Sequence, residues 1–195
     1  MRPLGLIRDE RASTAAEFGL VAMIFVGCML GIIDMARLAF EINSAKAAAR
    51  HGARTAIVSS PVVAQLADFD AIAIGIPGGQ PVPEGTAGTG PFVCDSTSCT
   101  NGGTFVPANF TAVLTEMRRY YGRLQPANVV IEYRHRGLGT SGFIGSDVEP
   151  LVTVRLTGLT FQPVSLQIFG VGSLPIPSVA TTLTAESLGA TSATI

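Results

Sequence analysis

The sequence holds few side chains whose types and spacing suit catalysis. Its two histidines are His51 and His135, and neither has a nucleophile motif nearby. The hydrolase pattern Gly-x-Ser-x-Gly and the zinc-peptidase pattern His-Glu-x-x-His are both absent from the sequence. Glycine-rich stretches are present, but they lack the spacing and the lysine of a phosphate-binding P-loop. We therefore expect no enzyme and no bound cofactor.

Two pairs of carboxylates have a spacing that could contact a calcium ion. They are Asp68 with Asp70 and Asp147 with Glu149. Carboxylates in surface turns are far commoner than metal ligands, and calcium takes six to eight oxygen ligands. We therefore expect no metal site.

Two of the three cysteines lie close together in a glycine-rich stretch. Cys94 and Cys99 are separated by Asp-Ser-Thr-Ser, whereas Cys28 lies within an apolar run. A zinc site would need more ligands than two thiols with no histidine nearby. A small disulfide loop between Cys94 and Cys99 would suit an oxidising compartment, and a pair of free thiols is the alternative.

The N-terminus has the pattern of a basic leader followed by a membrane helix. Residues 1–12 carry three arginines, and the chain from Phe18 to Ile33 is uncharged and almost wholly apolar. This run reaches the length of about 20 residues that a spanning helix needs if it includes residues 13–16. Asp34 and Arg37 follow one helical turn apart and could pair near the membrane boundary. A cleaved secretory signal is a weaker interpretation, because the nearest small-residue cleavage site lies well past Asp34.

Glu17 stands at the entry of the apolar run and has two interpretations. A carboxylate that is desolvated in a membrane helix is costly, so it is a functional candidate. Acidic residues also favour the first turn of any helix, where the helix dipole stabilises them. The residues alone leave both interpretations open.

The segment from Arg11 to Phe18 resembles the processing site of Tad-type prepilins, and the chain is similar to the TadE-like family. In that family a small residue precedes the cleaved bond, a glutamate is the fifth residue of the mature chain, and an aromatic residue follows. The matching positions here are Ala12 and Ser13 at the bond, then Glu17 and Phe18. Ala12 departs from the usual glycine. The resemblance implies that a prepilin peptidase cuts between Ala12 and Ser13.

Helical character continues to about Val58, through a segment rich in alanine. Within it, Gly52, Ala53 and Arg54 form a Gly-Ala-Arg pattern that also resembles the TadE-like family. Small residues make a narrow helix face that allows close approach of a neighbouring helix. The same face could instead pack on the chain's own sheet, and both interpretations can hold together.

The remainder of the chain predicts a modest α+β domain. Glycine, proline, serine and threonine dominate residues 59–107, and we expect the Gly/Pro-rich stretch 71–107 to form a long loop. Asn109 could cap a helix from about Phe110 to Tyr121. Alternating apolar and polar residues predict three antiparallel strands on the long helix, in a pilin-like layout, at residues 128–136, 151–159 and 176–187.

Together these features predict a leader at residues 1–12, a helix at 13–58 that spans the membrane in its first half, and an extracytoplasmic domain at 59–195. The net charge of −1 argues against nucleic-acid binding.

By resemblance, we expect a minor pilin or pseudopilin of the Flp/Tad pilus. Its partners would be the lipid bilayer, a prepilin peptidase, other pilins and Tad assembly-platform proteins. We expect it in the bacterial inner membrane with its domain in the periplasm, or in a pilus at the cell surface. The alternative is a membrane-anchored periplasmic binding module that is not incorporated into a pilus.

Overall fold

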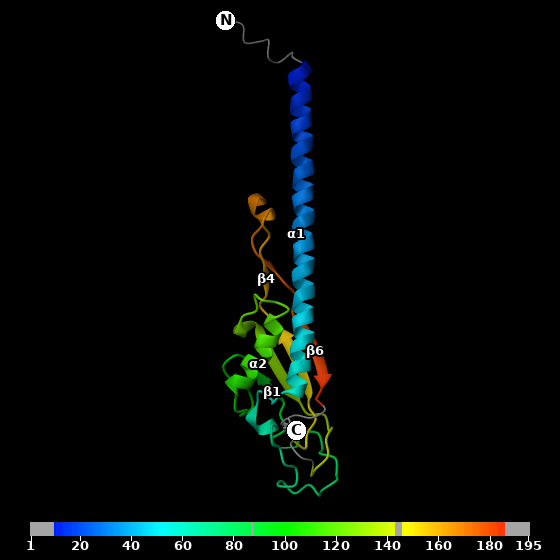
Figure 1. Cartoon of the computed structure of the whole chain (residues 1–195), viewed down its shortest axis with the longest axis vertical. Helices are drawn as coiled ribbons and strands as arrows, with labels where there is room; N and C mark the ends of the chain where they lie inside the picture. Colours follow the sequence, from blue (N-terminus) through cyan, green and yellow to red (C-terminus); the bar gives the residue numbers. More distant parts are fainter. Residues whose placement is uncertain (1–9, 87, 143–145, 186–195) are drawn as a thin grey trace, which may run out of the picture. The chain divides into compact units, whose positions relative to one another are not determined.

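The computed structural model describes residues 10–86, 88–142 and 146–185. One long helix, α1 (Glu10–Val58), is followed by short helices and strands, so the predicted α+β class is confirmed (Figure 1). The helix ends before Ser59-Ser60-Pro61, because a proline disfavours helical geometry in the residue before it. The chain divides into two compact units. Unit 1 contains Met1–Phe40 and Thr160–Leu174, and unit 2 contains Glu41–Leu159 and Pro175–Ile195.

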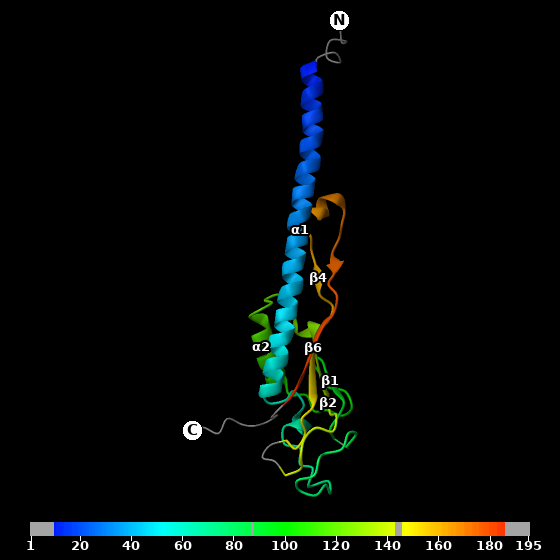
Figure 2. The same ribbon diagram turned by 90° about the vertical axis from the view of Figure 1, so that its right-hand side faces the viewer.

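Unit 1 combines the N-terminal part of α1 with one segment from late in the chain. That segment contains β4 (Thr160–Phe161) and the short 3-10 helix η4 (Leu166–Phe169). β4 pairs with β5 (Leu174–Pro175). Unit 1 ends at Leu174, the first residue of β5. Figures 1 and 2 both show the segment, coloured orange, beside α1.

Unit 2 is built on a four-stranded antiparallel sheet in the order β1-β2-β3-β6. The strands are β1 (Phe92–Cys94), β2 (Val129–Arg134), β3 (Leu151–Leu156) and β6 (Val179–Thr184). Alternate side chains of the two central strands are buried, as a half-buried sheet requires. The C-terminal part of α1 and helix α2 (Pro107–Arg118) lie on one face of the sheet (Figure 2). Two single turns of 3-10 helix, η2 (Ala64–Leu66) and η3 (Pro126–Asn128), complete unit 2.

The core of unit 2 includes a buried tyrosine that fixes the chain just after α1. The Tyr133 hydroxyl on β2 accepts a hydrogen bond of 3.0 Å from the backbone N–H of Val62. Burial raises the pKa of Tyr133 to about 12, so the phenol stays protonated over the physiological range. The chain after Val58 is thereby tied to the middle of the sheet.

The sequence placed the second helix three residues too late. It begins at Pro107, not near Phe110, and its N-cap residue is Val106. Proline suits the first helical position because its missing N–H would have no intrahelical partner there. The Asn109 side chain does not cap the helix but donates a hydrogen bond of 2.7 Å to the carbonyl of Pro61.

The predicted strands are also longer than the observed ones. Three strands were predicted, and the sheet has four because β1 forms inside the glycine-rich loop. β3 ends at Leu156, although the N–H of Thr157 still donates to the carbonyl of Asn128, its partner in the register of β2 and β3. β6 spans only Val179–Thr184, and positions 186–187 of the predicted last strand lie outside the described residues.

Asp70 and Asp147, two of the carboxylates considered above as calcium ligands, accept backbone hydrogen bonds in the loops of unit 2. The Asp147 carboxylate is buried and accepts hydrogen bonds from the backbone N–H groups of Ala71 and Gly142. Asp70 accepts from two backbone N–H groups two and three residues further on. Gly139 allows the close approach of the Asp147 backbone, because an added Cβ would lie 2.2 Å from the Asp147 carbonyl oxygen. Asp147 therefore holds the start of the long loop against the segment that precedes β3, whereas Asp70 stabilises its own turn.

Candidate membrane anchor and assembly surface

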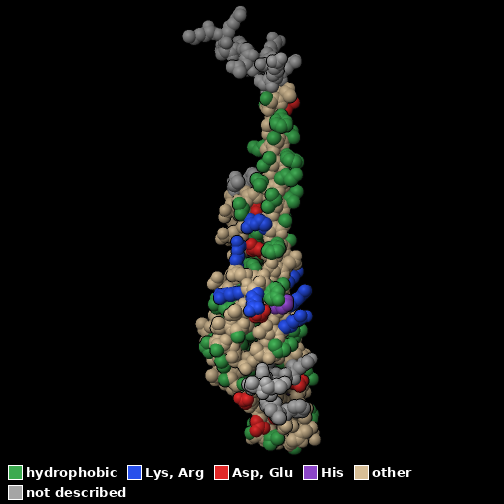
Figure 3. Space-filling model, in the orientation of Figure 1, with side chains coloured by type: hydrophobic (Ala, Val, Ile, Leu, Met, Phe, Trp, Pro, Cys, Tyr) green, Lys and Arg blue, Asp and Glu red, His purple; other side chains and the backbone are tan. Residues whose placement is uncertain are grey.

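The N-terminal part of α1 presents large apolar side chains on all sides. Phe18 and Met23 are each 74% exposed, and Figure 3 shows hydrophobic side chains along this part of the helix. In this helix, only 6% of the most apolar 18-residue window is buried inside the protein. A helix that is apolar on all sides is stable only where its side chains contact lipid or other apolar protein surfaces and not water. The other exposed large residues are Leu20, Val21, Ile24, Phe25, Val26, Met29, Ile32, Ile33, Met35 and Phe40.

This helix meets the length and composition of a membrane span. Over the described residues it is the one helix that does so, with a mean hydropathy of 2.2 in its most apolar window. The core helix of a soluble protein can pass the same test, but such a helix is mostly buried. Because so little of this helix is buried inside the protein, we expect lipid or neighbouring apolar helices to surround residues 18–33.

Two glycines of the anchor were not singled out from the sequence. Gly27 and Gly31 lie four residues apart, which places them on one face of the helix. An added Cβ at either position would have no heavy atom of the described chain within 4 Å. A small-xxx-small spacing is the pattern that allows close helix approach in membranes. The spacing was readable in the sequence, where only the Gly-Ala-Arg pattern was considered as a small-residue face.

The predicted processing site lies on the first turns of α1. Ala12 is within the helix. The Ser13 hydroxyl donates to a Glu17 carboxylate oxygen at 3.4 Å, and both side chains are exposed. Phe18 is exposed as well. The structure thus brings Ser13 and Glu17 together on one accessible helix face.

Asp34 connects α1 to the late segment of unit 1. Its side chain is buried, although it lies directly after the apolar run. The carboxylate accepts hydrogen bonds from three successive backbone N–H groups, at 3.1 Å from Val164, 2.9 Å from Ser165 and 3.1 Å from Leu166. We call this set of contacts the Asp34 clasp. A buried charge is tolerated only when it is satisfied in this way.

Ser165 adds a side-chain contact to the clasp. Its hydroxyl lies within hydrogen-bonding distance of the Asp34 carboxylate and of the Leu30 carbonyl, 3.0 Å away. One hydroxyl proton can serve only one of these acceptors at a time. Ser165 therefore fixes the late segment at the level of the last turn of the apolar run.

Arg37 completes the charge pairing beside the clasp. Its guanidinium donates to Asp34 at 3.3 Å, so the pairing expected from the sequence is present. The same guanidinium lies 5.5 Å from the centre of the Phe161 ring. The sequence showed the ion pair from its spacing, but it gave no sign that residues more than a hundred positions away share Asp34.

The Gly-Ala-Arg pattern packs within unit 2. An added Cβ at Gly52 would lie 2.6 Å from both Cγ and Sδ of Met117 on α2. Ala53 is fully buried, whereas Arg54 is exposed. Gly52 thus allows close contact inside the domain, but the neighbour is helix α2 and not the sheet that the second sequence interpretation named.

Glu41 forms a second polar contact on α1, within unit 2. It accepts from Arg123 at 2.9 Å and from the Tyr121 hydroxyl at 3.5 Å. Burial, and then the negative charge of Glu41, raise the pKa of Tyr121. The sequence did not indicate this pairing, because its members are some eighty residues apart.

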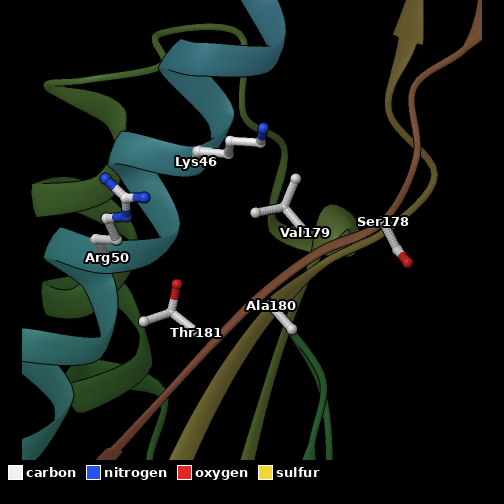
Figure 4. A pocket seen from close by; sticks show the side chains of 6 residues that line it. All are labelled: Lys46, Arg50, Ser178, Val179, Ala180 and Thr181. Carbon is white, nitrogen blue, oxygen red and sulfur yellow. The ribbon is translucent and has the colours of Figure 1, made fainter.

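A shallow groove lies between α1 and the edge strand of the sheet. It has a volume of 310 Å³ and is lined by Lys46 and Arg50 of α1 and by Ser178–Thr181 on the other side. Figure 4 shows the two basic side chains on the helix and the short side chains along β6. The groove could receive an anionic or extended group.

The remaining chemically notable residues have structural surroundings. Cys94 and Cys99 form a disulfide, and Cys28 is free and exposed. His51 stacks on Tyr120 with ring centres 3.8 Å apart. His135 is buried, and its Nε2 lies 3.1 Å from the Val82 carbonyl. In the part of the chain that the structure describes, no three His, Cys, Asp or Glu side chains gather as a metal site.

Comparison with protein families identifies the N-terminal region. Residues 12–54 match the family described as TadE-like protein, which confirms the resemblance found in the sequence. Comparison with curated proteins and with solved structures gives no match. The matched region covers the apolar helix and the Gly-Ala-Arg pattern, and the sheet lies outside it. The match supports a Tad-pilus-associated protein that is anchored by its N-terminal apolar helix.

Proposed function

We propose that this protein is a minor pilin or pseudopilin of the Flp/Tad pilus, with a structural and not a catalytic role. The observation that carries the proposal is the division of α1. Residues 18–33 expose their apolar side chains, whereas small residues from Ala45 to Ala56 are buried in the protein's own domain. An exposed apolar helix attached to a folded domain can move from lipid into a bundle of similar helices. Other pilins and Tad assembly-platform proteins are its partners.

Processing at the Ala12–Ser13 bond would release this helix for assembly. The family match begins at Ala12, and Ser13 is exposed on the first turns of α1. Intact-mass analysis of protein purified from its native membrane tests the proposal. We expect a chain that begins at Ser13. Retention of residues 1–12 in the presence of an active prepilin peptidase would contradict it.

A matched pair of variants separates recognition from general disturbance of the helix. Ala12→Leu should block processing, because the small residue before the bond is replaced by a bulky one. Ala36→Leu makes the same change at an exposed position further along α1 and should leave processing intact.

Glu17 acts in assembly after cleavage. Cleavage creates a free amine on Ser13, whose side chain already lies against the Glu17 carboxylate. Pairing with that amine, in the same or a neighbouring subunit, neutralises two charges that are costly in lipid. Glu17→Gln should be cut normally but enter pili poorly, and Glu17→Asp should retain part of the assembly. Normal assembly of Glu17→Gln would leave Glu17 with only a helix-dipole role.

The domain lies in the periplasm in this proposal. A disulfide such as Cys94–Cys99 persists in an oxidising compartment. Thiol labelling in native membranes tests this placement: Cys94 and Cys99 should react only after reduction, and Cys28 should serve as the unpaired reference. Labelling of all three without reductant would contradict the periplasmic placement.

The second candidate function is a membrane-anchored periplasmic binding module. The groove that bears Lys46 and Arg50 is the observation that favours it. This function predicts an uncut chain that is absent from pili sheared off the cell, so the mass measurement and pilus fractionation separate the two.

A further inference from the structure

We infer that the segment Thr160–Leu174 is a second membrane contact, which lies in the lipid interface beside the end of the spanning helix. The inference rests on the membrane anchoring of α1. It concerns a part of the chain outside the matched family region. In this inference, lipid contacts the exposed side of the segment.

The Asp34 clasp fixes the depth of the segment. The helix from Ser13 to Ile33 is about 31 Å long at 1.5 Å per residue, close to the 30 Å of a bilayer's hydrocarbon core. Asp34 therefore falls at the membrane boundary. Ser165 contacts both Asp34 and the Leu30 carbonyl, so its backbone stands within about one helical turn of that boundary.

The composition of the segment suits the interface better than water. Its fifteen positions from Thr160 to Leu174 contain no Asp, Glu, Lys, Arg or His. Val164 is 66% exposed at the clasp itself. Charged residues make up 14% of the whole chain, so an uncharged segment that exposes an apolar side chain beside a membrane helix is consistent with lipid contact.

Several backbone N–H groups of the segment have partners within the protein, which suits a poorly hydrated site. Unsatisfied N–H groups are costly in lipid, and irregular backbone is not found exposed in the hydrocarbon region. Here the N–H groups of Val164, Ser165 and Leu166 donate to Asp34. Those of Gly170 and Val171 donate back to carbonyls of η4. These internal hydrogen bonds reduce the cost of removing the turn from water and place it at the interface, not in the core.

Arg37 fits the same location. Its guanidinium pairs with Asp34 and lies over the Phe161 ring, yet the side chain remains 37% exposed. Long basic side chains at a helix end extend toward the headgroup region. The segment therefore presents an apolar side chain next to a partly exposed cation of α1, the arrangement that the outer part of a lipid leaflet accommodates.

The chain contains no tryptophan, so a single introduced tryptophan reports on its own surroundings. The full-length protein would be placed in two sets of phosphatidylethanolamine–phosphatidylglycerol vesicles, with lipids spin-labelled near the headgroup in one set and in the middle of the acyl chain in the other. Val164→Trp is the test variant, Phe25→Trp is the reference within the span, and Val58→Trp is the matched control. Val164 and Val58 are both exposed valines, at 66% and 74%.

We expect Val164→Trp to show blue-shifted emission and several-fold stronger quenching by the spin-labelled lipid than Val58→Trp. Quenching of Val164→Trp only by aqueous iodide, alongside lipid quenching of Phe25→Trp, would overturn this inference and leave the anchor intact. A blue shift without lipid quenching, dependent on the protein-to-lipid ratio, would assign the surface to a second copy and overturn it too. Absence of quenching of Phe25→Trp by the label in the middle of the acyl chain would reject the anchor and the inference together.

Discussion

Residues 13–33 and residues 41–58 lie on one continuous helix, yet they meet their surroundings in opposite ways. In the first stretch the large apolar side chains are exposed, with Phe18 at 74%. In the second stretch the buried apolar residues are small, with Ala45 and Ala53 fully buried. Large side chains without partners need a cover from outside the chain, whereas small ones let the helix approach its own domain. Side-chain size, as well as hydropathy, therefore distinguishes the anchor from the domain half.

The largest effect should come from enlarging a glycine in the domain half. Gly52→Leu would place its Cβ 2.6 Å from Met117, which is itself fully buried and has little room to move. Overpacking of this kind costs about 1–3 kcal/mol and occasionally more, and a 2.6 Å approach to two atoms of a fully buried side chain places Gly52→Leu at or above the upper end of that range. The gain in helix propensity on replacing glycine offsets at most about 1 kcal/mol. Denaturant unfolding of the domain in the full-length protein measures the loss.

Gly31→Leu is the matched control in the anchor half. Nothing described in the chain lies within 4 Å of an added Cβ there, so the stability of the domain should not fall. Incorporation into pili is the property that this variant should impair, if neighbouring helices approach at that glycine. Equal loss of domain stability in both variants would remove the distinction between the two halves.

The next effect concerns the disulfide. Replacing Cys94 and Cys99 together by serine should lower the free energy of unfolding of the domain by about 2 kcal/mol, because the cross-link closes a short loop. β1 should loosen, since Cys94 pairs with Ile131 of β2 at its end. Cys28→Ser, on the exposed surface of the anchor, should leave unfolding unchanged. Hydrogen exchange of the β1 amides, with denaturant unfolding, checks both expectations.

The sequence predicted the features that depend on neighbouring residues. The long helix, the Cys94–Cys99 pair and the Asp34–Arg37 pair all follow from short spacings, and the structure contains each of them. Strand β1 was missed because it is three residues long and lies among turn-forming residues. Its pairing with β2 creates a strand that local pattern does not indicate.

The contacts of Asp34 and Glu41 lay beyond the reach of sequence reasoning for a different reason. Their partners, such as Ser165 and Arg123, are distant in sequence and carry no motif. For Asp34 the donors are mainly backbone N–H groups, which every residue except proline offers. The signal available was a carboxylate next to an apolar run, which implies that some partner exists but does not identify it.

A local effect should follow from removing the Asp34 carboxylate. Asp34→Ala leaves the N–H groups of Val164, Ser165 and Leu166 without their acceptor. We expect their hydrogen exchange to accelerate by roughly tenfold or more, while amides of β2 and β3 are unaffected. Asp34→Asn keeps one acceptor oxygen and should show an intermediate increase. Unchanged exchange at these amides in Asp34→Ala would show that the clasp does not hold the segment.

The smallest effect should come from Asp95, an exposed carboxylate of unit 2 that also accepts several hydrogen bonds. The backbone N–H of Thr97, then its hydroxyl and the N–H of Ser98, hold the pKa of Asp95 below its ordinary value. Since the folded pKa is lowered, the contribution is present above the unfolded pKa of about 3.9 and is lost as pH falls through the folded value. Water screens the group, so we expect less than about 1 kcal/mol.

Unfolding of Asp95→Asn and of the wild type over a range of pH measures this contribution. The difference in unfolding free energy should be constant near neutral pH and should vanish in acid, below the folded pKa. The disulfide holds Asp95 between its two cysteines, so the variant with both cysteines replaced by serine should bring the pKa of Asp95 back toward its ordinary value. Carboxyl NMR titration reads that pKa directly. If Asp95 kept its lowered pKa without the cross-link, the Thr97 and Ser98 donors alone would be sufficient to order the turn, and the disulfide would act only on β1.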